Sequence, residues 1–198
     1  MRYSTISFVC CLLLMGPFVK AQNNVWDSLN KRRLTINQNH LYVLGSWAAA
    51  NIVQGSISAT NTTGSTRYLH QMNAYWNTVN LAIAGLGIWA LKMQLKQKIT
   101  PVDLLQEQKT VEKLLLLNSG LDIAYIMTGL YMKEKGLRLQ NDRNIGFGNS
   151  LVIQGSFLLV LDLVQYFTHQ KNGKAIHEEA KKVQWGVGAN GLGLTYRL

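Results

Sequence analysis

The chain has 198 residues, of which 47 % are hydrophobic and 15 % are charged, and its formal net charge is +10. This length is enough for one ordinary domain. The lysines and arginines gather at the ends of apolar segments, where they would contact lipid headgroups, so nucleic acid is excluded as a partner despite the positive charge. Cys10 and Cys11 lie together in the first apolar run, which excludes a disulfide framework and a thiolate metal site.

Residues 1–21 have the pattern of a secretory signal peptide. A basic Arg2 precedes an apolar core over residues 6–15, and Ala21 provides a small residue at the cleavage position. We therefore expect residues 1–21 to be removed, which leaves residues 22–36 as a polar N-terminal segment. The alternative is an uncleaved first membrane helix, which the shortness of the apolar run disfavours.

Four further segments are uncharged or nearly uncharged over about twenty residues, a length that crosses a bilayer. A soluble helix of that length would carry charges on its water-facing side. The sequence therefore predicts an all-α membrane protein, a four-helix antiparallel transmembrane bundle over residues 37–170. The predicted helices cover about residues 37–58, 66–96, 100–135 and 145–169.

Several residues predict where these helices begin and end. Thr100 as the cap, Pro101 at the first helical position and Asp103 in the first turn are typical of a helix start. From there nothing breaks the helix until Gly136, which suits its end. The other predicted caps are Ser65 or Thr66 for the second helix and Asn141 for the fourth.

Residues 171–198 form a predicted extramembrane tail with two parts. Over residues 174–184 the charges alternate, and Glu178 lies four residues before Lys182, which favours a short surface helix. Residues 185–198 alternate in character on both sides of an Ala-Asn-Gly turn signal. This alternation predicts a β-hairpin or an extended strand.

Asparagines interrupt the second apolar segment on one helical face, because Asn73, Asn77 and Asn80 fall at i, i+4 and i+7. An amide that faced lipid would leave its donors and acceptors without partners, at a cost on the order of several kcal/mol. The stripe must therefore face other helices. The other apolar segments carry similar polar residues, and the complete candidate set is Asn51, Gln54, Asn73, Asn77, Asn80, Asn118, Asp122, Gln154 and Asp162.

This polar set has two interpretations. The favoured one is interhelical hydrogen bonding that holds the bundle together. The alternative is a polar cavity or ion path, because a carboxylate within a membrane span is by default a candidate site. Asp122 is the stronger candidate because it is central in its segment, whereas Asp162 lies nearer a membrane face, which favours a solvated position.

The two interpretations lead to two hypotheses about function. The first is a non-enzymatic membrane protein with a structural or partner-binding role, whose partner is a second copy of the chain or another envelope protein. The alternative is a small transporter or proton-coupled carrier that uses Asp122 together with Asn77, Asn80 and Gln54. An intramembrane enzyme is disfavoured, because the segments hold no nucleophile and base in a recognisable pair.

No cofactor or metal is expected. The sequence contains no nucleophile elbow, phosphate loop or dinucleotide fingerprint. His40 and His169 lie at segment ends without the spacing of a metal site, so we expect interfacial or solvated histidines there.

Two rules disagree about orientation. Lysines and arginines are more numerous on the side that holds the N-terminus, the second connection and the tail, which places these parts in the cytoplasm. A signal peptide places the mature N-terminus outside. We favour the signal peptide, because the charge rule weakens over long connections. The expected location is a bacterial inner membrane, crossed several times, with a periplasmic tail.

Three motifs in these segments point to one family. They are His70-Gln71-Met72-Asn73 with Trp76-Asn77 and Asn80, then Asn118 with Asp122, and then Gln154-Gly155-Ser156. On these motifs the chain resembles a family of small, uncharacterised four-helix membrane proteins from bacteria of the Bacteroidetes type, over about residues 35–168. The resemblance implies the bundle fold and the membrane location. Because that family has no assigned activity, the resemblance implies nothing about chemistry.

Overall fold

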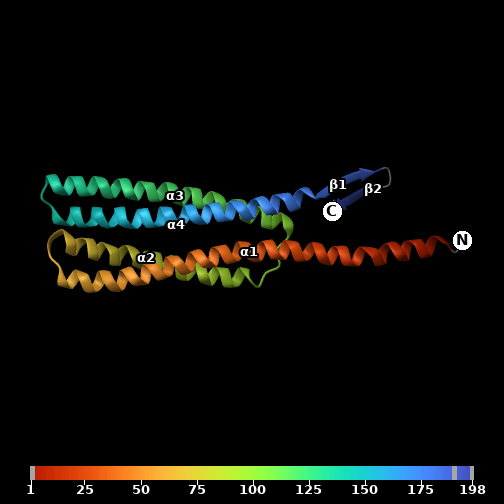
Figure 1. Ribbon diagram of the computed structural model, residues 1–198, viewed down its shortest axis with the longest axis horizontal. Coiled ribbons are helices and arrows are strands. Elements are labelled where there is room, and N and C mark those ends of the chain that lie inside the picture. The colour runs from red at the N-terminus through yellow and green to blue at the C-terminus, as the bar shows by residue number, and fades with distance from the viewer. Residues whose placement is uncertain (1–2, 189–190, 197–198) are drawn as a thin grey trace.

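A computed structural model describes residues 3–188 and 191–196, with side chains over residues 25–182. Four long helices make up most of the chain: α1 (Tyr3–Asn61), α2 (Gly64–Gln94), α3 (Pro101–Arg138) and α4 (Asp142–Lys181). Two strands follow, β1 (Val183–Gly188) and β2 (Gly191–Tyr196). The predicted four-helix arrangement is therefore present (Figure 1).

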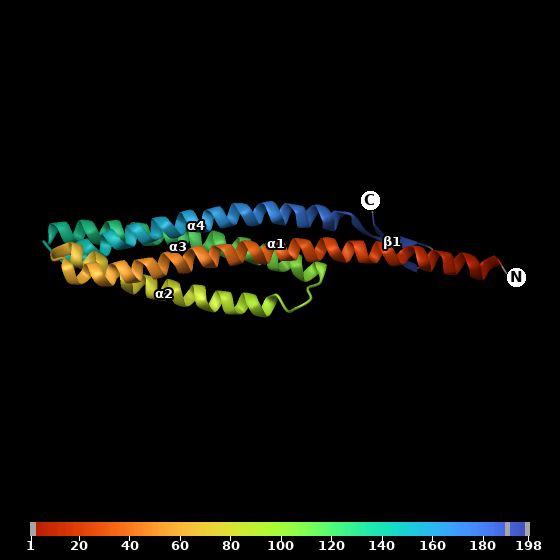
Figure 2. The ribbon, with the colours of Figure 1, turned by 60° about the horizontal axis from the view of Figure 1, so that its bottom comes forward.

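The helices form two antiparallel pairs, α1 with α2 and α3 with α4, which lie along one another in an elongated bundle (Figure 1 and Figure 2). Helix α4 packs against all three other helices, whereas the backbones of α2 and α3 do not approach each other over their described lengths. The short connections at residues 62–63 and 139–141 lie at one end of the bundle. The α2–α3 connection, the N-terminal part of α1 and the strands lie toward the other end (Figure 1).

Two of the predicted helix caps are confirmed. Oγ1 of Thr100 accepts a hydrogen bond from the backbone nitrogen of Asp103 at 3.2 Å and donates to Oδ2 of the same residue at 2.6 Å. Oδ1 of Asn141 accepts from the backbone nitrogen of Asn144 at 3.0 Å. Each bond satisfies a backbone donor that the first turn of a helix would otherwise leave free.

Helix α2 begins earlier than predicted. Its N-cap is Thr63, which precedes Gly64 at a φ of 60°. Because glycine has no Cβ, it adopts this left-handed conformation without strain. The side chain of Thr63 makes no capping hydrogen bond, and neither Ser65 nor Thr66 occupies the cap position, so that prediction was wrong.

Replacing Thr100 with alanine should lower the thermal stability of the protein, because the change removes the hydrogen bond to Asp103. Loss of an N-cap bond costs about 1 kcal/mol. Thr63→Ala removes the same side chain from a cap position without such a bond, so its melting temperature should stay nearly unchanged. Thermal unfolding of both purified variants by circular dichroism compares them, and equal losses would contradict the capping role.

Two segments that were predicted to be separate are continuous with the bundle helices. Residues 22–36 continue α1, and residues 174–181 continue α4 rather than forming a helix of their own. Both extensions have packing partners, because Trp26 of α1 and Ile176 of α4 form a small hydrophobic core cluster with Leu104 of α3. This apolar burial explains why neither helix stops where its sequence becomes polar.

The predicted helix end at Gly136 was also wrong, because α3 continues to Arg138. The chain instead adopts a left-handed conformation at Gln140, with a φ of 48°. Gly136 is a point of close approach between helices: a Cβ there would lie 2.7 Å from the backbone nitrogen of Ile145 on α4. The missing side chain at Gly136 therefore serves helix packing rather than helix termination.

The two strands pair antiparallel, with Val183 opposite Tyr196 and Gly188 opposite Gly191. The alternating pattern predicted either a β-hairpin or an extended strand, and the structure has the hairpin. Residues 189–190, part of the Ala-Asn-Gly turn signal, lie outside the described residues.

The burial pattern along the bundle is the reverse of that in a soluble protein. Side chains buried between the helices are largely polar, and many large apolar side chains point outward. In water, a contiguous apolar exterior of this kind is unfavourable. The buried polar residues of the middle part are Asn73, Asn77, Asn80, Ser119, Asp122, Ser150, Gln154, Asp162, Gln165 and His169. Apolar residues that are more than half exposed include Val53, Ile57, Val79, Ile83, Leu86, Trp89, Leu117, Val160 and Phe167.

By length and composition, two of the described helices, α3 and α4, could cross a membrane. Helix α2 and the part of α1 over residues 25–61 do not meet the same measure, because their amide and imidazole side chains make them less apolar. The sequence predicted four transmembrane helices, and two of the four are apolar enough to cross a membrane by this measure. The presence of four helices in the fold does not depend on this measure.

Glycines allow α3 and α4 to pack with their backbones close together. A Cβ at Gly148 would lie 2.5 Å from the carbonyl oxygen of Gly129, and a Cβ at Gly129 would lie 2.7 Å from the carbonyl oxygen of Gly148. About two helical turns further along α4, a Cβ at Gly155 would lie 3.1 Å from the carbonyl oxygen of Asp122. These small residues hold the Asp122 face of α3 against α4.

Candidate functional site

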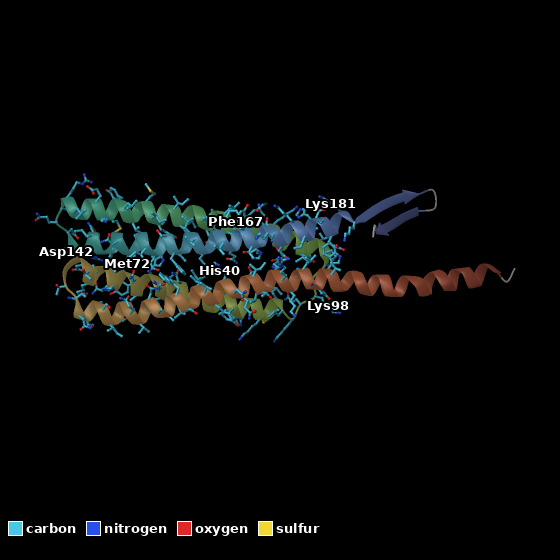
Figure 3. All side chains as sticks on the ribbon, in the orientation of Figure 1. His40, Met72, Lys98, Asp142, Phe167 and Lys181 are labelled. Carbon is cyan, nitrogen blue, oxygen red and sulfur yellow. The ribbon has the colours of Figure 1, made fainter. Side chains whose placement is uncertain are left out.

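The buried polar side chains form three groups along the bundle, from the end with the short connections toward the hairpin end. We call them the Gln154 network, the Asp122 cavity and the His169 network. Figure 3 labels His40, which belongs to the middle group, about halfway along the bundle, with Asp142 at the end of the short connections and Lys98 toward the other end.

The Gln154 network consists of Trp47, Asn51, Asn73, Ser150 and Gln154. Oε1 of the fully buried Gln154 accepts a hydrogen bond from Nε1 of Trp47 at 2.8 Å. Its Nε2 donates to Oδ1 of Asn73 at 3.2 Å and to Oδ1 of Asn51 at 3.4 Å. Oγ of Ser150 also donates to Oδ1 of Asn73, at 2.5 Å. Because α1, α2 and α4 all contribute, these bonds hold three helices in register.

Asn77 and Asn80 continue the polar stripe of α2 toward the middle of the bundle. Nδ2 of Asn77 donates to the backbone carbonyl of Asn73 at 2.8 Å, and Nδ2 of Asn80 donates to Oδ1 of Asn77 at 3.3 Å. All three asparagines are buried, as expected for a stripe that faces protein. Asn80 also lines the Asp122 cavity.

The His169 network lies on the hairpin side of the cavity and consists of Asn37, Gln108, Gln165, His169 and Asn172. Nε2 of Gln108 donates to the backbone carbonyl of His169 at 2.7 Å, and Nδ2 of Asn172 donates to Oε1 of Gln108 at 3.2 Å. Oδ1 of Asn37 lies 2.8 Å from Nε2 of His169 and accepts from Nε2 of Gln165 at 3.1 Å. His169 is fully buried, so the prediction of an interfacial or solvated histidine was wrong.

Between the two networks lies the Asp122 cavity, with a volume of about 250 Å³. All four helices line it. Its polar lining is His40, Trp76, Asn80, Asn118, Asp122, Tyr125 and Asp162, and its apolar lining is Leu44, Val79, Ile83, Leu121 and Leu158.

Both carboxyl groups of the middle part of the bundle lie in this cavity. Asp122 is 4 % exposed and Asp162 is 6 % exposed. Nε2 of His40 lies 3.7 Å from Oδ1 of Asp162, and the side chain of Asn118 forms a hydrogen bond with Asp162. The expectation of a solvated Asp162 was therefore wrong, because packing against α1 and α3 covers it. His40 is likewise largely buried inside the bundle rather than interfacial.

Three buried polar atoms around the cavity have no hydrogen-bond partner in the described part of the chain: Oδ2 of Asp122, Nδ1 of His40 and Nε1 of Trp76. In the His169 network the atoms without a partner are the amide oxygens of Gln165 and Asn172, whose amide nitrogens are bonded. Leaving a buried polar atom unpaired is costly. The Asp122 cavity is therefore the place where a bound group would gain most from the protein.

The lining of the cavity favours a group that carries positive charge and donates hydrogen bonds. Two carboxylates in one apolar-walled cavity repel each other, so a proton or a cation between them is stabilising. Among the described residues, no group of three or more His, Cys, Asp or Glu side chains is placed to hold a metal ion. The arrangement thus suits a proton or an ammonium group better than a metal that needs a full set of protein ligands.

Gln54 is the predicted site residue that lies outside these groups. Its side chain is exposed. Nε2 donates to Oγ of Ser58 on the same helix at 3.1 Å and lies 3.4 Å from Nδ1 of His70 on α2. The next residue, Gly55, packs against α2, where a Cβ would lie 2.7 Å from the carbonyl oxygen of His70. That contact turns Gln54 away from the interior.

The other predicted residues divide between two of the groups. The Gln154 network with its α2 extension contains Asn51, Asn73, Asn77 and Gln154, and the cavity is lined by Asn80, Asn118, Asp122 and Asp162.

A buried positive charge, Arg33, lies at the hairpin end of the bundle and is 2 % exposed. Its guanidinium donates to Oδ1 of Asn30 at 3.1 and 3.2 Å, to Oε1 of Gln94 at 3.3 Å and to Oε2 of Glu107 at 3.4 Å. Burial lowers the pKa of Arg33 and the nearby Glu107 raises it, and a guanidinium stays charged throughout the physiological range. These bonds join α1 to the ends of α2 and α3 beside a cavity of about 400 Å³. Because Arg33 is already paired, this cavity is the weaker candidate site.

The sequence patterns did not reveal the His169 network or the cavity residues His40 and Trp76. A signal for the network exists, because Gln165, His169 and Asn172 fall at i, i+4 and i+7, the same spacing as the α2 stripe. The predicted helix ended at His169, whereas α4 continues well beyond it. A single histidine or tryptophan carries no such periodic signal.

The similarity of this chain to known proteins lies in the helical bundle. No curated protein and no solved structure matches the chain significantly. Residues 43–163 match the profile of DUF6992, a family of unknown function. This range covers more than half of the chain and contains every polar residue of the candidate set. The chain therefore belongs to the DUF6992 family.

Proposed function

We propose that the chain is an integral membrane protein whose four helices cross the bilayer around an interior cation-binding site. The reversed burial pattern supports membrane insertion, because amides, histidine and carboxyl groups are inside while valine, leucine and tryptophan are outside. A lipid environment accepts such an exterior and requires the polar groups to pair with one another inside the bundle.

The length of the uncharged helix segments fits a bilayer. On α3, residues 114–132 carry no charge apart from Asp122, which lies near their middle. At 1.5 Å per residue this segment is about 28 Å long, close to the thickness of a hydrocarbon core. The framing charges would lie among the headgroups: Arg33, Lys92, Lys113 and Lys171 on one side, and Arg67, Lys133 and Arg143 on the other.

The proposed orientation is the one that a signal peptide sets, with the α2–α3 connection and the hairpin on the periplasmic side of a bacterial inner membrane. With Cys10 and Cys11 replaced by serine, a single cysteine introduced at Gln97 should react with an impermeant maleimide in intact cells. One introduced at Gln140 should react only after permeabilisation. The reverse pattern would overturn the orientation alone, and reaction at both positions in intact cells would overturn the four-span arrangement.

The proposed cation-binding site is the Asp122 cavity. The observation that carries this function is the buried Oδ2 of Asp122, which has no hydrogen-bond partner among the described residues although a second carboxyl group, Asp162, lines the same cavity. A carboxylate within a membrane span is a functional candidate by default. The Gln154 and His169 networks have the interhelical hydrogen bonds expected of a structural role.

A second candidate function is supported by those two networks: a purely structural polar core, with a second copy or another envelope protein as the partner. In that case Asp122 only helps to hold the helices together. No cation would then compete for its carboxyl group.

Modification by dicyclohexylcarbodiimide separates the two candidates. This apolar reagent adds to protonated carboxyl groups within membranes. Mass spectrometry of the remaining unmodified peptide measures the total reaction of Asp122, so that the reagent adduct and any amide formed with an added amine are both counted. In phosphatidylcholine vesicles, an ammonium compound that binds in the cavity should slow the reaction. At about ten times its dissociation constant, a ligand should slow it about tenfold.

Two comparisons make this assay specific. Asp162→Asn removes one of the two cavity carboxyl groups and should weaken the protection of Asp122. Glu134 is exposed on the outer part of α3. Labelled in parallel by a water-soluble carbodiimide with excess glycine ethyl ester as the trapping amine, it should lose its unmodified form equally with and without the ligand amine. If neither methylammonium nor a long-chain amine protects Asp122, the cation-binding function is wrong and the structural core is favoured.

A further inference from the structure

The Asp122 cavity opens to the side of the bundle rather than toward its ends. Its inner wall includes the buried Leu44 of α1 and Asp162 of α4. Its rim includes Val79 and Ile83 on α2 and Leu121 on α3, all of which are exposed. Because the backbones of α2 and α3 do not approach each other, the mouth lies between these two helices.

The mouth has an apolar surround and a polar back wall. Trp76 and Tyr125 bridge α2 and α3 on the side of the short connections, edge to face, with ring centroids 4.8 Å apart. The exposed Asn118 lies on the side toward the hairpin end. The outer surface of the two helices nearby is apolar, and Leu86 and Leu117 are each more than half exposed.

In the proposed membrane position the mouth faces acyl chains. Val79 lies near the middle of the uncharged stretch between Arg67 and Lys92 on α2, and Asp122 lies near the middle of its stretch on α3. These positions are about half the hydrocarbon thickness away from either headgroup region. A ligand that reaches the mouth from the side must therefore first dissolve in the bilayer.

We propose that the Asp122 cavity binds a single-chain amphiphile with an ammonium headgroup, which enters from the bilayer between α2 and α3; this inference rests on the cation-binding function proposed above. The ammonium donates a charge-assisted hydrogen bond to Oδ2 of Asp122 and is attracted by Asp162. A hydroxyl oxygen beside the ammonium, as in an amino alcohol, accepts from Nε1 of Trp76. The chain of the ligand leaves between Val79 and Leu121.

The size of the cavity supports a headgroup site. Its volume of about 250 Å³ is smaller than typical pockets that enclose whole ligands, which measure about 300–1,000 Å³. A long hydrocarbon chain would therefore remain in the bilayer. Toward both bundle ends the interior is occupied by the hydrogen-bonded side chains of the Gln154 and His169 networks, so the side mouth is the open route for a ligand.

Protection of Asp122 from carbodiimide tests the class of ligand. In phosphatidylcholine vesicles, dodecylamine should protect Asp122, whereas methylammonium, which has the charge but no chain, should protect it at least about tenfold less at equal concentration. Dodecanol and dodecanoate have the same chain without a positive charge, and neither should protect.

A matched pair of variants tests the side entrance. Val79 and Val53 are both 60 % exposed, so a tryptophan at either position should not disturb the packing, but only Val79 lies on the rim. Val79→Trp should reduce the protection by dodecylamine about tenfold, equivalent to about 1.4 kcal/mol of binding. Val53→Trp should leave the protection unchanged. If Val79→Trp folds poorly, Leu121→Trp closes the mouth from α3.

The possible failures are distinguishable. Equal protection by methylammonium and dodecylamine would overturn the amphiphile and leave cation binding in place. The amphiphile would also be overturned if dodecanol protected Asp122 as well as dodecylamine does. The same holds if dodecylamine protected Asp122 undiminished in a folded Val79→Trp or Leu121→Trp protein. Absence of protection by both amines would remove the cation-binding function as well.

Discussion

Replacing Gly148 with alanine is expected to lower the stability of the protein by about 2 kcal/mol. The new Cβ would lie 2.5 Å from the carbonyl oxygen of Gly129 and 2.5 Å from the backbone nitrogen of Lys133, so α3 and α4 must separate. Overpacking costs about 1–3 kcal/mol, and the upper end applies here because both clashing atoms are backbone atoms that cannot rotate away. Subtracting a gain of about 1 kcal/mol in helix propensity leaves a net loss of about 2 kcal/mol. The melting temperature in detergent should fall by about 4–8 °C.

Glycines on the outside of the bundle provide the control for Gly148. A Cβ at Gly85 or Gly120 would have nothing within 4 Å. Gly85→Ala and Gly120→Ala should therefore gain helix propensity and melt slightly higher than the parent protein. Thermal unfolding followed by circular dichroism gives the melting temperatures of the three variants. A loss for Gly120→Ala as large as that for Gly148→Ala would show that close α3–α4 packing is not the cause.

Gln154→Leu is expected to cost about 2–4 kcal/mol, because it leaves two half-buried groups without a partner. Nε1 of Trp47 loses its acceptor, and Oδ1 of Asn51 loses its donor. Each buried group left unsatisfied costs about 1–3 kcal/mol. Oδ1 of Asn73 keeps its bond from Ser150, which limits the total.

The matched control is Gln54→Leu. Residues 51–56 and 151–156 are similar in sequence, and both contain Gln-Gly-Ser. Gln54 is exposed, and its Nε2 donates to Oγ of Ser58 of its own helix and lies 3.4 Å from Nδ1 of His70 on α2. Because both contacts lie at the surface, their loss should change the melting temperature little. Thermal unfolding in the same detergent measures both variants. Similar losses in the two proteins would contradict an interhelical role for Gln154.

Local signals predicted part of this fold well. The caps at Thr100 and Asn141 are confirmed because an N-cap bond forms within one turn, so the few residues that make it are adjacent in sequence. The burial of Asn73, Asn77 and Asn80 is confirmed, because helical periodicity places all three on one face of α2.

Other predictions were wrong where distant packing outweighs a local signal. Gly136 was predicted to end a helix, but it lies where α3 packs closely against Ile145 of α4. Residues 174–184 were predicted to form a separate short helix, but Ile176 packs with Trp26 and Leu104, and α4 continues through residue 181. Gln54 has the spacing of an interior residue, yet the approach of α1 to α2 at Gly55 leaves it outside.

The sequence by itself determined that this protein has four long helices, where two of them begin, and that an asparagine stripe on α2 must be covered by protein. These properties depend on neighbours within a few turns. Only the tertiary structure decided that Asp122 and Asp162 share one cavity with His40, and that the cavity opens between α2 and α3. The rotation and offset of a helix against its neighbours depend on close contacts such as Gly148 on Gly129, which join residues far apart in the chain and leave no periodic pattern in it.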